Sequence, residues 1–408
     1  MSKIEELIEK YCPVGVEYKE MGELGCFYGG LTGKSKDDFK DGNANLITYV
    51  NVYKNLALDL HDTAKVKIRP DEKQRKLKYL DVIFTGSSET PDECAFSSVV
   101  CEKPQEDYYL NSFCFVWELN DKNLFNPHFL KHLFRSDELR YKLGRTASGV
   151  TRFNVSKERM RKVQIPVPPL EVQNEIVRIL DNFTELTAEL TAELTARKQQ
   201  YEFYRDKLLT FPEGGQNIEW RTLGEVANFR NGVGHEKEIV ANGKYIVVNS
   251  KFISTNGLVK KFSDNQLSPL YVNDILMVMS DLPNGKALAK CFLVAENDKY
   301  TLNQRICALT NKDNDAVDVK FLFYILNRNS QLLRYDNGVD QTNLKKDDIL
   351  NILVPIPSLQ VQQRIVNILD NFDKICSDLS VGLPAEIEAR QKQYEYYRNK
   401  LLSFKIKK

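Results

Sequence analysis

The sequence predicts an α+β fold in which two globular domains are separated by two long antiparallel helices, arranged as a pseudo-two-fold internal repeat. Three observations support this prediction. The chain has 408 residues, which is too many for one ordinary hydrophobic core. Two long segments with helical periodicity resemble each other. Each is preceded by a segment of short β-type runs broken by Gly, Asn and Pro.

The composition is typical of a globular protein, with 42% hydrophobic and 28% charged residues. No run of 18 apolar residues predicts a membrane span. The start, MSKIEELIEKYCP, is acidic where a targeting signal is basic or apolar, so we expect a cytoplasmic protein. The eight cysteines form no CxxC pair, which favours free thiols. Because the net charge is only +1, any site for a polyanion must be a local patch.

The repeat is clearest in the helical segments. IPVPPLEVQNEIVRILDNF (165–183) matches VPIPSLQVQQRIVNILDNF (354–372) at 12 of 19 positions, with an offset of 189 residues. ARKQQYEFYRDKLLTF (196–211) matches ARQKQYEYYRNKLLSF (389–404) at 11 of 16 positions, with an offset of 193 residues. The second copy therefore carries four additional residues, and we do not expect strict two-fold symmetry of the helices.

Weaker matches extend the repeat into the segments upstream. VEYKEMGELGCFYGG (16–30) pairs with IEWRTLGEVANFRNG (218–232), and Gly149-Val150 with Asn154 and Lys157 corresponds to Gly338-Val339 with Asn343 and Lys346. The chain is therefore expected to have four parts: a globular domain with a short N-terminal helix (1–164), a central helical spacer (165–217), a second globular domain (218–353) and a distal helical spacer (354–408).

The central spacer begins after Pro168-Pro169, which suits the first turn of a helix. Apolar residues then recur at steps of three and four, which predicts a helix of about 40 residues and roughly 60 Å. A helix this long cannot bury its apolar stripe alone, so the two spacers should pack as an antiparallel pair. Gly382 and Pro384 should bend or break the distal helix. The spacer seam is expected to include Leu186, Leu190, Leu194, Tyr201, Leu208, Tyr394 and Leu401.

Motifs for catalysis are missing from the sequence. No GxxxxGK[ST] run could cradle a nucleotide phosphate, and the DNA-methyltransferase type of site fails at Asn126-Pro-His-Phe129, which has His where a second Pro belongs. We therefore expect no catalytic residues. His128 and His132 lie four apart and could share a metal, but their apolar neighbours favour a helix packed on a core, so no metal site is expected.

Local charge is more informative than the total. Residues 65–78 carry seven basic against two acidic residues, and residues 135–162 carry nine against three. Such clusters could line phosphates, and the alternative is a solvated basic face. The corresponding region of the second domain, 328–348, is nearly balanced in charge.

Loops near the Gly-rich positions carry the side-chain types that read base edges, which are Arg and Lys for guanine, Asn and Gln for adenine, and Ser and Thr for either. The candidate DNA-binding residues of the first domain are Thr32, Lys34, Ser35, Lys36, Thr85, Ser87, Ser88, Arg145, Ser148, Thr151, Arg152 and Asn154. Those of the second domain are Arg230, Asn231, His235, Lys237, Asn249, Lys251, Ser280, Asn284, Lys286, Asn303, Gln304, Arg305, Gln341, Asn343 and Lys345. Each residue alone is more typical of a turn, so the prediction rests on the whole set.

Several motifs together resemble the specificity subunit of bacterial type I restriction-modification enzymes. They are RILDNF (178–183), TAELTAEL (187–194), RKQQYEFYRDKLLTF (197–211) and the second copy of the helical segment. The resemblance extends over nearly the whole chain, although the globular segments match only at TGSSETPDE (85–93), LNSFC (110–114) and LNQRICAL (302–309). The TAEL tandem resembles a subgroup whose central spacer varies by copies of that tetrapeptide.

The resemblance implies that each globular domain is a target recognition domain that reads one half of an asymmetric, bipartite site on double-stranded DNA. The helices would set the distance between the halves and dock two methyltransferase (modification) subunits, which carry S-adenosylmethionine and methylate adenine. Restriction (motor-nuclease) subunits would bring ATP, magnesium and cleavage. This chain would itself hold no cofactor and catalyse no reaction.

One TAEL unit adds about 6 Å and about 40° of rotation to a helix. Deleting Thr191–Leu194 is therefore expected to change the DNA spacer by about one or two base pairs while both half-sites stay the same.

Two other functional classes stay open on the sequence. The chain could be a non-catalytic helical scaffold whose end domains bind proteins or glycans, or, as a weaker alternative, an enzyme that acts alone. Salt-dependent binding to duplex DNA separates the leading hypothesis from the scaffold, because counterion release is expected only on a polyanion. Methyl transfer by the purified chain would reveal the enzyme.

Overall fold

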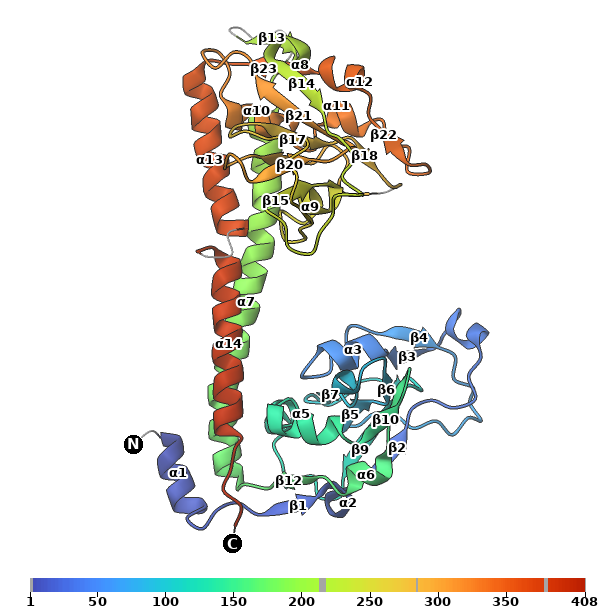
Figure 1. Ribbon diagram of the computed structural model, residues 1–408. Coiled ribbons are helices and arrows are strands. Elements are labelled where there is room, and N and C mark those ends of the chain that lie inside the picture. Colours follow the sequence, from blue (N-terminus) through green and yellow to red (C-terminus); the bar gives the residue numbers. More distant parts are fainter. Residues whose placement is uncertain (1–2, 213–217, 284, 378–380, 408) are drawn as a thin grey trace. The chain divides into compact units, whose positions relative to one another are not determined.

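The computed structural model describes residues 3–212, 218–283, 285–377 and 381–407. The chain forms two compact units, of which the first comprises Met1–Ala192 with Ala385–Lys408 and the second comprises Glu193–Pro384. Each unit mixes helices and sheets, as the sequence predicts for the α+β class (Figure 1). Within the described ranges, no helix is both long and apolar enough to cross a membrane.

The first unit is built on a four-stranded antiparallel sheet with the strand order β2-β9-β5-β7. Its strands are β2 (Gly25–Gly29), β9 (Cys114–Leu119), β5 (Val82–Thr85) and β7 (Ser97–Val99). The central strands β5 and β9 are buried almost throughout. Trp117 on β9 is fully buried, and its indole Nε1 donates a hydrogen bond to the Met21 carbonyl at 3.0 Å, which ties the sheet to α2 (Met21–Leu24).

Three smaller sheets complete the first unit. They are β4 (Ala64–Val66), β3 (Ala44–Ile47) and β8 (Tyr108–Leu110); β10 (Ala147–Gly149), β11 (Phe153–Val155) and β6 (Ser87–Ser88); and β1 (Tyr18–Glu20) with β12 (Gln164–Pro166). The helices are α1 (Lys3–Tyr11), α2, α3 (Tyr49–Lys54), α4 (Pro127–Leu133), α5 (Asp137–Gly144) and α6 (Lys157–Arg161), with short 3₁₀ turns at Lys36–Phe39 and Pro91–Glu93.

The second unit repeats these sheets, which confirms the internal repeat, except that among the described residues no strand corresponds to β10. Its strands are β14 (Ala227–Asn231), β21 (Ile306–Asn311), β17 (Ile275–Val278) and β19 (Cys291–Leu293); β16 (Phe262–Ser263), β15 (Tyr245–Val248) and β20 (Tyr300–Leu302); β18 (Ser280–Asp281) and β22 (Thr342–Asn343); and β13 (Glu219–Thr222) and β23 (Leu353–Ile356). Its short helices are α8 (Leu223–Val226), α9 (Ser250–Ser254), α10 (Val319–Leu326), α11 (Ser330–Leu333) and α12 (Lys346–Leu350).

The first long helix, α7, runs without a break over the 40 residues Leu170–Leu209, as predicted. The distal spacer is two helices, α13 (Leu359–Ser377) and α14 (Leu383–Leu401), so the predicted interruption near Gly382 and Pro384 is confirmed. Pro384 itself lies in the first turn of α14, where its missing N–H costs no helical hydrogen bond. Residues 378–380, between these helices, lie outside the described residues.

Each unit packs one distal helix antiparallel to its own part of α7 (Figure 1). In the first unit, Phe183 stacks on Tyr397 of α14 with 5.3 Å between ring centroids. In the second unit, Tyr201 and Tyr204 contact Phe372 of α13. Among the predicted seam residues, Tyr394 and Leu401 pack on the first core and Tyr201 and Leu208 on the second, whereas Leu186, Leu190 and Leu194 are half-buried.

A buried glutamine joins each globular body to the first turns of its long helix. Gln173 accepts a hydrogen bond from the Asn126 backbone N–H at 2.9 Å and donates to the Leu124 and Pro168 carbonyls. Gln362 accepts from the Asp318 N–H at 2.8 Å and donates to the Ala316 and Pro357 carbonyls. Both side chains are fully buried, and the two junctions are equivalent atom for atom.

Candidate nucleic-acid interface

The predicted DNA-binding residues of the first unit gather best around the sheet β10-β11-β6, which we call the first ribbon. Asn154 on β11 faces Ser87 on β6, and Ser148 on β10 faces Asn154 from the other side. Ser148, Thr151, Arg152 and Asn154 are exposed, while Ser87 is buried beneath them. The ribbon therefore presents four polar side chains on a short, hydrogen-bonded frame.

The second unit has an equivalent second ribbon, formed by β18 and β22. Asn343 on β22 faces the buried Ser280 on β18, in the same register as Asn154 and Ser87. Gln341 is exposed beside them, and its amide donates to the Ser280 hydroxyl at 2.7 Å. Lys345 follows at the start of α12 and is exposed. Lys286 is exposed elsewhere in this unit, and Asn284 lies outside the described residues.

Two of the predicted residues, Thr85 and His235, have buried side chains in this structure. Thr85 is fully buried, and its hydroxyl oxygen accepts a hydrogen bond from the Phe96 N–H at 3.0 Å. His235 is 1% exposed and is hydrogen-bonded through both ring nitrogens, to the Val233 carbonyl and the Thr301 hydroxyl. Both side chains satisfy buried polar groups of the fold, so we assign them a structural role.

Other candidates are held by internal contacts. The Lys34 ammonium, on a largely buried side chain, pairs with Glu72 and donates to the Lys67 carbonyl at 2.5 Å. Arg230 donates to the Ser268 hydroxyl and to the Pro269 carbonyl at 2.8 Å. Asn249 caps α9, Ser88 donates to Glu93, and Asn303 accepts from the Gln304 N–H. Gln304 donates to Glu236 at 2.6 Å.

The remaining candidates are exposed at loop positions. Thr32, Ser35, Lys36, Arg145, Asn231, Lys237, Lys251 and Arg305 all lie on the surface. Arg145 donates to the Tyr141 hydroxyl at 2.9 Å, and Ser35 begins a 3₁₀ turn that its side chain caps together with Asp38. These side chains are accessible to solvent, and their contact with DNA remains a prediction.

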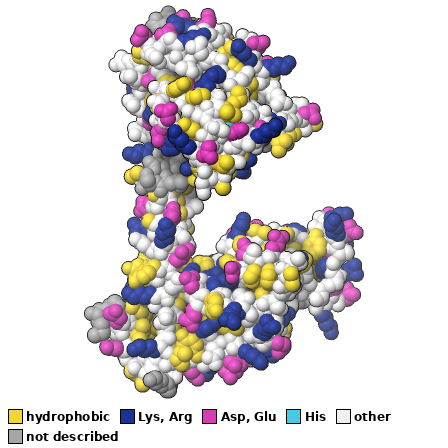
Figure 2. Space-filling view, viewed as in Figure 1, with side chains coloured by type: hydrophobic (Ala, Val, Ile, Leu, Met, Phe, Trp, Pro, Cys, Tyr) yellow, Lys and Arg dark blue, Asp and Glu magenta, His cyan; other side chains and the backbone are white. Residues whose placement is uncertain are grey.

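The basic clusters are neutralised more than their sequence suggests. In the cluster 65–78, Arg75 and Lys78 pair with Glu118, and Lys76 pairs with Asp107 at 2.7 Å. Arg135 and Arg140 of the second cluster are largely buried and donate to backbone carbonyls; burial lowers the pKa of each guanidinium to about 10. On the face seen in Figure 2, basic and acidic side chains are interspersed over both units.

A cavity of about 640 Å³ opens beside the first ribbon and is lined by Tyr49, Tyr53, Ser87, Ser88, Glu89, Glu93, Phe113, Thr151 and Arg152. Hydrogen bonds from Ser88 and Tyr53 lower the pKa of Glu93, so this wall carries negative charge. The rings of Phe113, Tyr49 and Tyr53 were missed by the sequence analysis. LNSFC (110–114) could have indicated Phe113, since that motif already matches the family.

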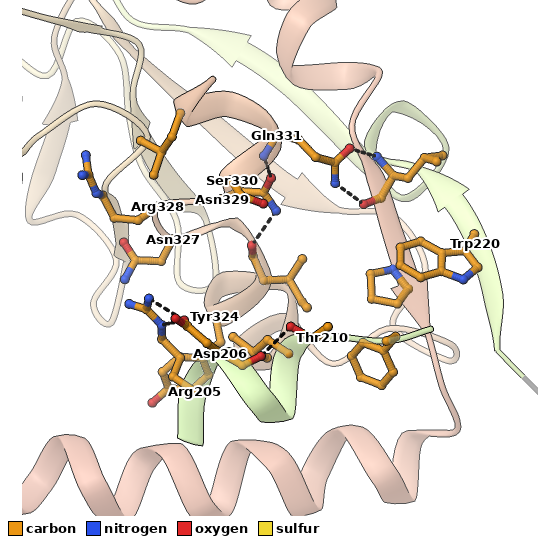
Figure 3. Close-up of a pocket in the computed structure, with 16 residues that line it drawn as sticks. Arg205, Asp206, Thr210, Trp220, Tyr324, Asn327, Arg328, Asn329, Ser330 and Gln331 are labelled. Atoms are coloured by element: carbon orange, nitrogen blue, oxygen red, sulfur yellow. Dashed lines mark hydrogen bonds and ion pairs between the residues drawn. The ribbon is translucent and has the colours of Figure 1, made fainter. Parts of the chain in front are cut away.

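The second unit has a cavity of about 550 Å³ between the C-terminal end of α7 and the helices α10 and α11 (Figure 3). Arg205 in its wall pairs with Asp206 at 2.7 Å, and Gln331 exchanges two hydrogen bonds with the backbone of Leu353. The equivalent place in the first unit is bridged, because Arg398 and Asn399 both bind the Asp137 carboxylate. The charged residues that line the second unit's cavity are Arg205, Arg328 and Asp206, and none of the predicted DNA-binding residues lines it.

His132, considered above as a metal ligand, is hydrogen-bonded within the fold through both ring nitrogens. Its Nε2 lies 2.6 Å from Asp181 Oδ1, and its Nδ1 lies 2.9 Å from the Tyr394 hydroxyl. Burial lowers the pKa of His132, so the ring is neutral and donates through Nε2. Burial opposes the ionisation of Asp181, but hydrogen bonds from His128, His132 and Lys131 outweigh it and hold its pKa well below the usual range. No group of three or more candidate metal-ligating side chains occurs in the described parts of the chain.

Comparison with known proteins identifies the family. The model of the type I restriction modification DNA specificity domain matches this sequence twice, over residues 13–197 and 216–389. The chain belongs to this family. The match is a repeated one, in agreement with the repeat in the sequence and in the sheets.

Individual relatives carry the same description. The specificity subunit of the type I restriction enzyme EcoR124I/EcoR124II from Escherichia coli is 37% identical over 271 residues, which cover 61% of this chain and 65% of that subunit. The matched stretch thus spans just under two thirds of that relative. A Haemophilus influenzae protein assigned as a type I restriction enzyme specificity subunit is 32% identical and covers 71% of this chain and 75% of its own length.

Solved structures support the fold. One similar chain comes from a structural study of how the type I R-M system assembles and changes conformation. It aligns with a TM-score of 0.64 and 17% identity, over 95% of this chain and 97% of that chain. The S subunit of the type I restriction-modification system from M. genitalium is similar with a TM-score of 0.50 and 16% identity, over 95% and 96%. At these identities the likeness establishes the architecture alone.

Proposed function

We propose that this chain is the DNA-recognition subunit of a type I restriction-modification complex. In this proposal, residues 1–164 and 218–353 are two target recognition domains, and each reads one half of a bipartite, asymmetric site on double-stranded DNA. Residues 165–217 and 354–408 are the helical spacers. They fix the number of base pairs between the halves and provide the docking surface for two methyltransferase subunits.

One observation carries the proposal. Two copies of a similar strand framework present equivalent ribbons on which some exposed side chains are shared and others, such as Arg152 and Gln341, differ. A shared framework places both ribbons against DNA in the same manner, while different side chains at equivalent positions select different bases. Two such readers in one chain recognise two unlike half-sites without requiring a palindrome.

The chain acts as a reader and not as a catalyst in this proposal. S-adenosylmethionine belongs to the methyltransferase subunits, and ATP and magnesium belong to the restriction subunits, which carry translocation and cleavage. We place the assembly in the cytoplasm, where its DNA substrate lies. The family match and the names of the relatives support this division of labour.

The test is binding and methylation by the chain assembled with its methyltransferase subunits. We expect sequence-selective binding to duplex DNA whose affinity falls steeply between about 50 and 200 mM salt, because Lys and Arg release counterions from the phosphates. With S-adenosylmethionine, adenine methylation should map to one bipartite sequence. Binding without salt dependence or sequence preference would favour the protein- or glycan-binding scaffold. Methyl transfer by the isolated chain would instead support an enzyme.

A further inference from the structure

The two ribbons agree residue by residue in the frame that holds their exposed side chains. Ser87 and Ser280 are 6% and 7% exposed and occupy the same position on β6 and β18. Asn154 and Asn343 face them from β11 and β22 and are exposed. The backbone continues the match, because the Val155 N–H donates to the Gly86 carbonyl and the Leu344 N–H donates to the Met279 carbonyl.

The side chain two residues before each asparagine differs between the units. Arg152 donates through Nε and Nη2 to the Ser87 hydroxyl oxygen, at 3.3 and 3.1 Å. Gln341 donates through Nε2 to the Ser280 hydroxyl oxygen, at 2.7 Å. The same buried serine therefore orients an arginine in one unit and a glutamine in the other. Both side chains are exposed.

The serine contact leaves the base-reading edge of each side chain open. Ser87 occupies the Nε side of the Arg152 fork, and among the described residues Nη1 has no hydrogen-bond partner. The Gln341 amide donates to the Ser280 hydroxyl at 2.7 Å and, in a long contact of 3.4 Å that a base acceptor can replace, to Asn343 Oδ1; its Oε1 accepts no hydrogen bond from the described part of the chain. An arginine held this way can donate two parallel hydrogen bonds, and a glutamine can donate one and accept one.

Charge favours a base over a phosphate at the first ribbon. Glu89 and Glu93 line the cavity beside Arg152, and their carboxylates repel a phosphate group. The guanidinium also lies over the Phe113 ring, 5.2 Å from its centroid, which further fixes the plane of the fork. At the second ribbon Gln341 carries no charge, so any attraction to the DNA backbone there comes from neighbouring residues.

An exposed valine marks the tip of the loop at the same place in both units. Val150 is 91% exposed and Val339 is 74% exposed, and each follows a glycine with positive φ, Gly149 or Gly338. A Cβ at Gly149 would lie 2.0 Å from the Arg152 carbonyl oxygen, so the tight loop requires glycine. Exposed apolar side chains beside oriented polar ones suit the mixed surface of base edges, where a thymine methyl group or a base face is apolar.

We propose that Arg152 and Gln341 are equivalent specificity-determining residues, of which Arg152 selects a guanine in one half-site and Gln341 selects an adenine in the other. This inference rests on the proposed function and goes beyond it, since it assigns one base pair of each half to one side chain. Arginine pairs with the O6 and N7 acceptors of guanine, whereas glutamine pairs with the N6 donor and N7 acceptor of adenine. The discrimination against the wrong base should be about 10- to 100-fold at that base pair.

The experiment exchanges the two residue types. The chain, assembled with its methyltransferase subunits and S-adenosylmethionine, methylates a DNA library with randomised half-sites, and sequencing gives the selected bases. We expect R152Q to change one base pair of one half-site from a guanine to an adenine preference. We expect Q341R to make the opposite change in the other half only. The matched controls are K162Q, which removes an exposed charge at the C-terminal end of α6, and N228R, which adds one on β14; neither should change a selected base.

Each outcome decides the question. If R152Q and Q341R select the same half-sites as the unaltered chain, or change bases in both halves, the assignment is wrong although the proposed function stands. A uniform loss of methylation on every library sequence also overturns it, because a residue that reads one base pair leaves the others readable. If the unaltered complex selects no bipartite sequence at all, the proposed function itself fails.

Discussion

The two junctions between body and helix show which parts of the repeat are kept and which vary. Gln173 and Gln362 make the same three hydrogen bonds in both units. Two turns further along each helix, the aspartate is also kept, but its partners differ. Asp181 is bound by His132 and Lys131, whereas Asp370 is bound by Tyr324 and Lys320. The part that fixes a body to its helix is therefore constant, while the residues that the body contributes can change.

This pattern extends to the ribbons. Ser87 and Ser280 are identical and buried, and Asn154 and Asn343 are identical and exposed, whereas Arg152 is replaced by Gln341. Phe113, beneath Arg152, corresponds to Arg305, since the Gly86 N–H binds the Phe113 carbonyl and the Met279 N–H binds the Arg305 carbonyl. The comparison therefore separates a frame of shared residues from the reader residues, such as Arg152 and Gln341, that differ between the units. Four predictions test that separation.

The largest effect is expected at the glutamines. Q173L and Q362L each keep the size of the side chain but leave three backbone groups, one buried and two partly buried, without partners. Each should destabilise its own unit by about 3 kcal/mol. The free energy of unfolding of each unit is measured by denaturant titration, with hydrogen exchange in peptides of each unit as the readout. The control Q199L, on an exposed face of α7, should change stability by less than about 0.5 kcal/mol. Unequal losses in the two units would show that the junctions are not equivalent.

We expect a smaller effect in which the stability of the first junction, but not that of the second, depends on pH. The pKa of His132 is lowered by burial below its unfolded value of about 6.5, so the stability tied to the neutral ring is present above that value and is lost as the pH falls. In the second unit, burial and the hydrogen bond to Asp370 raise the pKa of Tyr324, which stays protonated throughout. Acidification from about pH 7 to 5 should therefore loosen the contact of α4 with α7 and leave that of α10 with α13 unchanged.

Hydrogen exchange in the peptides of α4 and α10 at several pH values checks this difference. The groups that face His132 are His128 and Lys131 on α4, Asp181 on α7 and Tyr394 on α14. H132Q keeps a hydrogen-bonding side chain without the titration, so it should remove most of the pH dependence of α4. An unchanged pH response in H132Q would assign the effect to another group.

The next prediction concerns the serines beneath the readers. S87A and S280A remove the acceptor that orients Arg152 and Gln341, at a cost of about 1 kcal/mol in the fixed geometry. We expect the selected sequence to stay the same while discrimination at one base pair of the corresponding half falls roughly fivefold. Competition between matched and mismatched DNA measures it. A fall in affinity that is equal for both DNAs would indicate a general structural effect.

The sequence predicted the repeated helices well because helical periodicity and capping are local signals. Pro168-Pro169 fixed the start of α7 to within a few residues, and Gly382 indicated the break between α13 and α14. The order of the strands in each sheet could not be predicted from such local signals. In each four-stranded sheet, a strand such as β2 pairs with β9, whose residues lie about 90 positions away, and no local pattern selects that partner.

The candidate site was predicted unevenly for the same reason. Arg152, Asn154 and Gln341 were found because the repeat marks their loops at Gly149-Val150 and Gly338-Val339. Thr85 and His235 are buried, which the sequence could not show, since a residue type does not reveal whether its side chain is exposed. Lys34 is neutralised by Glu72, which lies 38 residues away, so its charge could not be judged from its neighbours.

The smallest effect on stability is expected from the deletion of Thr191–Leu194, which lies between the parts of α7 that carry the two bodies' contacts. The removed residues belong to a continuous helix, and the glutamine junctions and ribbons are untouched. Removing four residues shortens the helix by about 6 Å and rotates it by about 40°. Mapping of methylated adenines should therefore show both half-sites unaltered, with the number of bases between them changed by one or two. Altered half-sites with an unaltered spacer would contradict the separation of reader and frame, because the helix would then influence the bases that are chosen rather than the distance between them.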